Sequence, residues 1–134
     1  MIKRMKAIST YSKKINVLYV EDDISIQKIT SDFLSSLFDN LIVASDGKEG
    51  LQKFQDNTID LIITDIIMPD KEGIETILDL KKEHADIKII AVSGGGRTNA
   101  MDNLRSARLL GASLTFEKPF ENKEILEAIS KLIG

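Results

Sequence analysis

The feature that most constrains the fold is an alternation of short apolar runs with amphipathic stretches. Five runs rich in Ile, Val and Leu have the length of strands, and they occupy residues 15–20, 41–44, 59–64, 87–92 and 113–117. After each run, apolar residues recur at helical spacing. Continuous apolar strands that alternate with helices are typical of parallel sheets covered on both faces. The sequence therefore predicts an α/β fold with a doubly wound, five-stranded parallel sheet.

Five helices are expected, and the first should begin near Ser25, whose hydroxyl is placed to cap it. Each helix should turn an apolar face to the core. The positions that mark these faces are Ile26, Ile29, Phe33, Leu34 and Leu37; Leu51 and Phe54; Ile74, Ile77 and Leu78, in line with Lys81; Met101, Leu104 and Leu109; and Ile125, Leu126, Ile129 and Leu132.

The length of 134 residues fits one domain. Residues 1–14 contain five basic residues and no acidic one, so we interpret them as a basic, solvated extension ahead of a domain at 15–134. The net charge of −3 gives no reason to expect direct nucleic-acid binding. The chain has no cysteine and no apolar run long enough for membrane insertion, which indicates a cytoplasmic protein without disulfides. No further domain is expected after the last helix.

Polar side chains follow the strands at the carboxyl ends, where sheets of this type bind ligands. They are Glu21, Asp22 and Asp23 after the first strand, Asp65 after the third, Ser93 after the fourth and Lys118 after the fifth. Two carboxylates about 4 Å apart repel by roughly 4 kcal/mol at an effective dielectric constant of 20. A cluster of acids therefore favours a bound cation, and hard oxygen ligands suit Mg²⁺.

Asp65 stands out because it ends the most hydrophobic strand, where an acid is hard to justify structurally. A carboxylate is a competent phosphoryl acceptor, and Mg²⁺, Lys118 and Ser93 would together contact the three phosphoryl oxygens. Each residue alone has a structural explanation, such as helix capping or turn formation. Their combination at the strand ends predicts a phosphorylatable aspartate. His84, the only histidine, lies in a polar helix end and is expected to be solvated.

The motifs VLYVEDD, ASDGKEGL, DLIITDIIMPDKEGIE, KIIAVSGG and GASLTFEKPF together resemble the receiver domain of two-component response regulators. The resemblance covers residues 15 to 134 and implies a flavodoxin-like (βα)5 fold with strand order 2-1-3-4-5. The roles that it implies are Asp65 as phospho-acceptor; Glu21, Asp22, Asp65 and the carbonyl of Ile67 as Mg²⁺ ligands; Ser93 and Lys118, before a cis Pro119, as catalytic groups; and Ser93 with Thr115 as the switch. Asp23 falls outside the acidic pair.

The sequence departs from the pattern of this family at one informative place. Thr115 occupies a position where the family often has an aromatic residue, so a switch that relies on an aromatic ring is not expected. Ile67 and Gly95 lie two residues beyond the acceptor and the hydroxyl. Neither side chain can hydrogen-bond a hydrolytic water, which predicts slow self-dephosphorylation.

The resemblance implies a stand-alone receiver that is a signalling protein rather than a conventional enzyme. A sensor histidine kinase or a histidine phosphotransfer protein would donate the phosphoryl group, and the output would be a downstream protein target or onward relay. A flavodoxin-like cofactor binder should instead carry a phosphate-cradling loop after the first strand, where this chain has EDD. An aspartyl-phosphate phosphohydrolase usually carries a second acid two residues after the nucleophile, at the position of Ile67.

Overall fold

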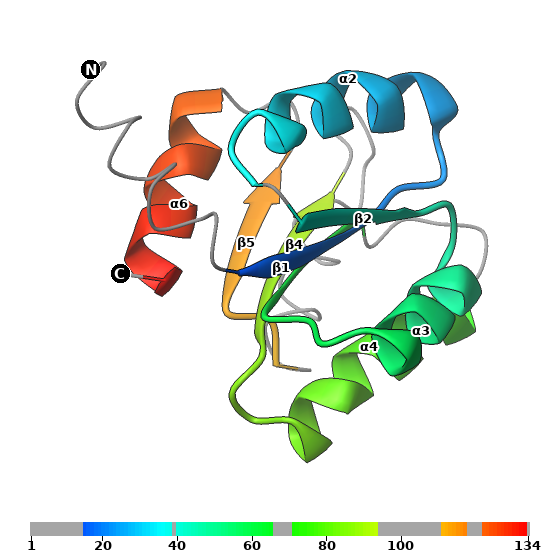
Figure 1. Ribbon diagram of the computed structural model, residues 1–134. Coiled ribbons are helices and arrows are strands. Elements are labelled where there is room, and N and C mark those ends of the chain that lie inside the picture. The colour runs from blue at the N-terminus through cyan, green and yellow to red at the C-terminus, as the bar shows by residue number, and fades with distance from the viewer. Residues whose placement is uncertain (1–14, 39, 66–70, 94–110, 118–121, 134) are drawn as a thin grey trace.

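The computed structural model describes residues 15–38, 40–65, 71–93, 111–117 and 122–133 (Figure 1). The strands lie close to their predicted positions and are β1 (Asn16–Val20), β2 (Asn40–Ala44), β3 (Leu61–Asp65), β4 (Lys88–Ser93) and β5 (Leu114–Glu117). The helices are α2 (Ile24–Ser35), α3 (Gly47–Asp56), α4 (Lys71–Glu83) and α6 (Asn122–Ile133). The helix predicted around Met101, Leu104 and Leu109, and the basic extension, lie outside the described residues. Among the described helices, none is long and apolar enough to cross a bilayer.

The five strands form one parallel sheet with the order β2-β1-β3-β4-β5. This order confirms the predicted doubly wound, flavodoxin-like arrangement. The register pairs Val20 with both Ala44 and Thr64, and it pairs Asp65 with Val92. The carboxyl ends of these strands therefore lie along one edge of the sheet.

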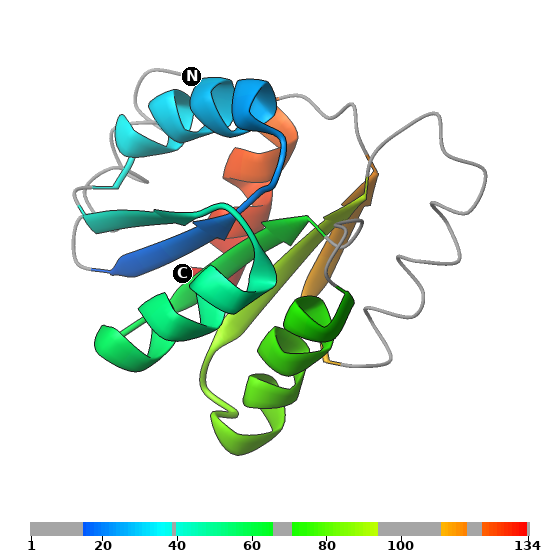
Figure 2. The ribbon, with the colours of Figure 1, turned by 90° about the vertical axis from the view of Figure 1, so that its right-hand side faces the viewer.

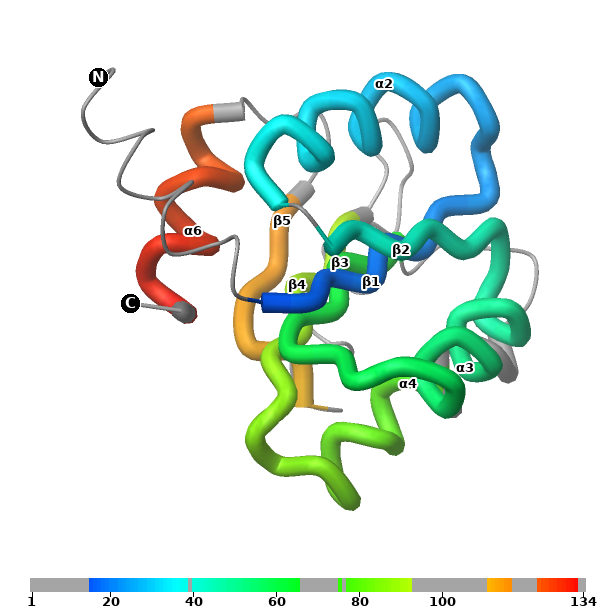
Figure 3. Tube along the Cα trace, viewed as in Figure 1, coloured from blue at the N-terminus to red at the C-terminus, as the bar shows by residue number. Residues whose placement is uncertain are grey.

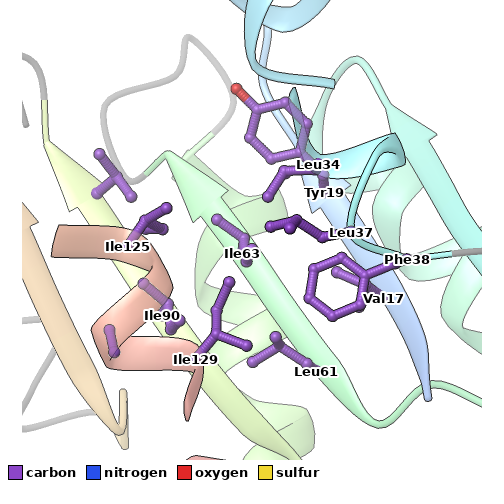
Figure 4. Packing of buried hydrophobic residues seen from close by; sticks show 12 residues of the cluster. Val17, Tyr19, Leu34, Leu37, Phe38, Leu61, Ile63, Ile90, Ile125 and Ile129 are labelled. Atoms are coloured by element: carbon purple, nitrogen blue, oxygen red, sulfur yellow. The ribbon is translucent and has the colours of Figure 1, made fainter. Parts of the chain in front are cut away.

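The helices cover the sheet on both faces, with α2 and α6 on one side and α3 and α4 on the other (Figures 1 and 2). In Figure 3, the tube runs over one face as α2, between β1 and β2, and over the other face as α3 and α4, which precede β3 and β4. Alternate residues of β1 serve the two cores: Leu18 joins Ile77 of α4, whereas Val17 joins Leu34 of α2 and Ile129 of α6 (Figure 4). The sheet is thus buried on both faces, as right-handed crossovers require.

The central strand β3 is buried along its whole length. Leu61, Ile62 and Ile63 are almost completely buried, and they alternate between the two cores. A strand with both faces covered has no solvent side for polar residues, so its sequence shows no alternation of apolar and polar positions. Asp65 ends this strand and is itself buried.

The start of α2 differs from the prediction. The capping residue is Asp23, whose Oδ1 accepts a hydrogen bond from the Ile26 backbone N–H at 3.1 Å. The prediction of Ser25 as the cap was wrong, because the helix begins one residue before it, at Ile24. An aspartate is as good a cap as a serine, and here the chain meets Asp23 first.

The apolar face of α2 is narrower than predicted. Leu34 and Leu37 are buried, but Ile29 is 73% exposed, so its assignment to the core was wrong. Ile26 and Phe33, its apolar neighbours at helical spacing, are only half-buried. Ile29 therefore lies beyond the margin of the face that α2 packs on the sheet. Ile24, at the start of the helix, is 75% exposed.

Candidate functional site

Three carboxylates gather where β1 and β3 end. Glu21 and Asp22 directly follow β1, and Asp65 is the last residue of β3. One oxygen from each of the three lies within 4.8 Å of the others. They meet because Val20 and Thr64, the residues just before Glu21 and Asp65, are partners in adjacent parallel strands. The predicted acidic cluster is therefore formed by the fold itself.

The burial of these acids differs from that of ordinary surface carboxylates. Glu21 is 1% exposed and Asp65 is 7% exposed, whereas Asp22 is half-buried and reaches solvent. Charged carboxylates are rarely buried unless they are paired, hydrogen-bonded or bound to a cation. The cluster thus lies in the sheet edge itself, with Asp22 at its solvent side.

Glu21 is held by hydrogen bonds from its own turn and from the neighbouring strand. Its backbone N–H donates to the Ala44 carbonyl at 3.0 Å, and its Oε2 accepts from the Asp23 N–H at 3.3 Å. Asp23 uses its own carboxylate to cap α2. The structural explanation that an acid after a strand caps the next helix therefore applies to Asp23, which stays outside the cluster of three acids.

Tyr19 lies beneath the acidic cluster and was not singled out from the sequence. It is buried in the core between the sheet, α2 and α6, two residues before Glu21 on the same face of β1 (Figure 4). Burial raises the pKa of its hydroxyl well above the ordinary value, a side-chain hydrogen bond with Thr30 opposes that rise, and the charges of Glu21 and Asp65 add to it. The sequence signal that could have identified Tyr19 is a tyrosine two residues after Val17, at a position of β1 that faces the core.

Of the other predicted residues, Ser93 lies at the same sheet edge and Thr115 lies within a strand, level with Thr64. Ser93 ends β4, one residue beyond Val92, the partner of Asp65. Thr115 lies in β5, is half-buried and pairs with Ala91 of β4. Ile67, Lys118 and Pro119 lie outside the described residues.

His84 lies away from this edge. It follows the carboxyl end of α4, ahead of β4, and is exposed as predicted. Its ring also contacts Phe54 of α3 in an edge-on arrangement, with the ring centroids 5.4 Å apart. His84 is therefore a contact between two helices and takes no part in the acidic cluster.

The donor set of the cluster fits a hard divalent cation. Three carboxylates supply only oxygen ligands, and the described residues contain no cysteine that would favour a softer metal. Mg²⁺ takes one or two carboxylates from a protein and keeps its remaining positions for waters or phosphate oxygens. A half-buried Asp22 beside a buried Asp65 leaves the solvent side for such ligands.

The family of the chain follows from this geometry together with a sequence comparison. The family model of the response regulator receiver domain matches residues 17–130, which include all three acids, most of β1, all of β2 to β5 and most of α6. The chain belongs to this family. Its members are signalling proteins rather than conventional enzymes, as predicted.

Curated relatives of this receiver domain are longer proteins. It is 30% identical over 123 residues to the probable C4-dicarboxylate response regulator DctR of Bacillus subtilis, covering 89% of this chain and 52% of that protein. It is 31% identical over 117 residues to the transcriptional regulatory protein CpxR of Escherichia coli, covering 87% and 48%. The chain spans about half the length of the curated relatives that it matches.

Solved structures support the same fold. A response regulator receiver domain protein from Clostridium thermocellum superposes with a TM-score of 0.77 at 28% identity, covering 89% of this chain and 94% of that one. A second match, at a TM-score of 0.73 and 23% identity, covers 90% of both chains. It comes from a co-crystal structure of the yeast histidine phosphotransfer protein Ypd1 with the receiver domain of the response regulator Ssk1.

Proposed function

We propose that this receiver domain accepts a phosphoryl group on Asp65 from a sensor histidine kinase or a histidine phosphotransfer protein in the cytoplasm. The observation that carries the proposal is the cluster of Glu21, Asp22 and Asp65, with one oxygen of each within 4.8 Å of the others. Such a cluster places a nucleophilic carboxylate beside two acids that suit Mg²⁺. The family match supports the same reaction class.

The reaction is a transfer between two side chains. A carboxylate oxygen of Asp65 attacks the phosphorus of a phosphohistidine on the donor protein, so that an O–P bond forms while the P–N bond breaks. The electron pair of the P–N bond goes to the imidazole, which takes up a proton. When bound, Mg²⁺ would neutralise charge on the phosphoryl oxygens. Glu21 and Asp22 would hold it, together with Asp65 and the carbonyl of Ile67.

The proposal also includes the roles that the family resemblance implies for Ser93, Lys118 and Thr115. Lys118 would supply a positive charge to a phosphoryl oxygen and the Ser93 hydroxyl would contact another, completing the charge stabilisation that the reaction needs. The phosphorylated Asp65 carries nearly two negative charges, which would bias a rearrangement at Ser93 and Thr115. Ser93 lies on β4, next to β3, and Thr115 lies on β5, next to β4, which supports a readout through this side of the sheet.

The donor protein is expected to dock on α2. Its histidine must approach Asp65 from the carboxyl edge of the sheet, and Ile24 lies two residues after Asp22 at that edge. Ile24 and Ile29 are the large apolar side chains that stand exposed among the described residues. Exposed apolar side chains near a reactive site are typical of a surface that binds another protein. The output would be altered binding to a downstream protein, or onward relay.

The decisive experiment is the intact mass of the protein after incubation with acetyl phosphate, with and without Mg²⁺. The wild type should gain one phosphoryl group only when Mg²⁺ is present, and Asp65→Asn should gain none. Absence of the added mass in the wild type would refute the proposal. Continuous release of many phosphates per protein would instead indicate a phosphohydrolase.

A further inference from the structure

Gln27, the fourth residue of α2, makes side-chain contacts with two strand ends. Its side-chain amide donates to the backbone carbonyl of Glu21 at 2.8 Å. The same nitrogen lies 3.4 Å from the Ala44 carbonyl and 3.3 Å from the Ser45 hydroxyl. An amide nitrogen has two hydrogens, so the short contact takes one and the two longer contacts share the other.

The acceptors of Gln27 belong to two segments that are distant in the sequence, one after β1 and one at the junction of β2 and α3, and both lie beside the acidic cluster. Glu21 follows β1, Ala44 ends β2, and Ser45 lies in the turn before α3. Gln27 itself is on α2, so one side chain ties the first helix to two strand ends and to a turn.

The contact with Gln27 holds the backbone carbonyl of Glu21, one of the three clustered acids. The Glu21 N–H donates to the Ala44 carbonyl, and the Glu21 carbonyl accepts from Gln27. With both backbone groups held, the direction of the Cα–Cβ bond is set, and the buried Glu21 carboxylate has little freedom left. Asp22 is bonded to the same carbonyl group, so its position depends on the same contact.

We propose that Gln27 is a positioning residue for the divalent-cation site, in that its amide holds the Glu21 backbone and so preorganises Glu21 and Asp22 for the ion. This inference rests on the proposed function, because it assumes that the cluster binds Mg²⁺. Removal of a group that hydrogen-bonds to a metal-ligating residue typically lowers metal affinity by about 10- to 100-fold. Gln27 acts through the backbone, and its effect is expected at the lower end.

The test compares Gln27→Met with Gln52→Met. Methionine keeps the length of the glutamine side chain but donates no hydrogen bond. Gln52 is an exposed residue of α3 that donates one hydrogen bond, to Asp56 at 3.0 Å, and it lies outside the acidic cluster, so it controls for the substitution itself. The readouts are the Mg²⁺ dissociation constant by calorimetry and the rate of phosphorylation by acetyl phosphate as Mg²⁺ is increased.

For Gln27→Met, the Mg²⁺ dissociation constant should rise by about tenfold, while the maximal rate at saturating Mg²⁺ should stay within about twofold of the wild type. Gln52→Met should change neither. A merely structural role would lower the free energy of unfolding without moving the Mg²⁺ half-saturation, and that result would overturn the inference. Loss of maximal rate with an unchanged dissociation constant would also overturn it.

Two further outcomes are separated by the design. If the wild type binds no Mg²⁺, the proposed function fails together with this inference. If the wild type binds Mg²⁺ and Gln27→Met binds it equally well, only the role of Gln27 fails. Should Gln27→Met not fold, Gln27→Asn gives the same comparison, because it retains the amide but cannot reach the Glu21 carbonyl.

Discussion

Gly50 in α3 lies directly against Val20, the β1 residue that immediately precedes Glu21. A Cβ atom at position 50 would lie 3.1 Å from Val20 Cγ2 and 3.1 Å from Ile77 Cδ1. Val20 and Ile77 are both fully buried, so neither side chain has free space into which it can move. The absence of a side chain at Gly50 therefore lets α3 approach the strand that leads into the acidic cluster.

The first prediction is that Gly50→Val destabilises the fold. The added methyl groups would overpack the contact with Val20 and Ile77, which typically costs about 1–3 kcal/mol of the free energy of unfolding. Lys48→Val, at an exposed position of the same helix, controls for the helix propensity of valine. Urea unfolding measures both variants. Equal stabilities for the two would show that the close approach is unimportant.

The strands and the acidic cluster could be predicted from the sequence because both follow from short-range patterns. Runs such as residues 59–64 are apolar on both faces, which occurs in a parallel sheet covered by helices. Parallel strands bring their carboxyl ends to one edge, so Glu21, Asp22 and Asp65 were expected together before any contact was known. The family resemblance adds roles for individual residues, and those roles stay predictions.

Other features depend on packing that the sequence does not display. The contact of Gln27 with Ala44 spans 17 positions in the chain, and no local pattern marks it. Ile29 has the helical spacing of a core residue, but the rotation of α2 on the sheet leaves it exposed. Asp23 and Ser25 are both good helix caps, and the choice between them depended on the residue at which α2 begins after β1.

The second prediction concerns charge repulsion in the cluster. Without Mg²⁺, Asp22→Asn should raise the free energy of unfolding by about 1 kcal/mol, since it removes one of three neighbouring negative charges and solvent screens the half-buried Asp22. Adding free Mg²⁺ to about ten times its dissociation constant should stabilise the wild type by about 1.4 kcal/mol, and Asp22→Asn by less. Thermal unfolding with and without EDTA measures both effects.

The control for this prediction is Asp32→Asn on the exposed side of α2, which changes the same charge outside the cluster. It should leave the Mg²⁺-induced stabilisation intact. If Asp22→Asn destabilises the metal-free protein, repulsion is not the dominant interaction among the three acids. If Mg²⁺ stabilises neither protein, the cluster is not a cation site.

The third prediction is slow loss of the phosphoryl group. Ile67 and Gly95 lie outside the described residues, and neither side chain can orient a water molecule for attack on the aspartyl phosphate. The phosphorylated protein should therefore persist well beyond seconds after excess acetyl phosphate is removed, as followed by intact mass. Ile67→Glu, which introduces a hydrogen-bonding side chain, should shorten that lifetime. A wild-type half-life of seconds would contradict the prediction.

The fourth prediction follows from the buried hydroxyl of Tyr19. Burial raises the pKa of this hydroxyl above the unfolded value of about 10. The Thr30 hydrogen bond lowers the pKa in part, and the negative charges of Glu21 and Asp65 raise it further. Because the folded pKa is the higher one, the stabilisation is complete below pH about 10 and is lost as the pH rises beyond it. The loss should approach about 1.4 kcal/mol for each pH unit.

Tyr19→Phe tests this directly, since it keeps the ring and removes the ionisable group. Its free energy of unfolding should fall less steeply than that of the wild type between pH about 9 and pH about 11. Near neutral pH the variant should lose about 1 kcal/mol, because the Thr30 hydrogen bond is gone. Tyr11→Phe replaces the chain's other tyrosine and should follow the wild-type slope. Parallel slopes for Tyr19→Phe and the wild type would disprove the assignment.

The last prediction separates docking from chemistry at the exposed surface of α2. Ile24→Ser and Ile29→Ser should each reduce the rate of phosphoryl transfer from a purified histidine phosphotransfer protein or kinase by about tenfold, because the donor would lose apolar contacts with α2. Both side chains are mostly exposed, so the free energy of unfolding should change by less than about 0.5 kcal/mol. Phosphorylation by acetyl phosphate, which needs no docking, should proceed at the wild-type rate. Lys53→Ser on α3, on the other face of the sheet, controls for a surface substitution in both assays. Equal losses with both phosphoryl donors would show that the isoleucines affect the site itself and that α2 is not the docking surface.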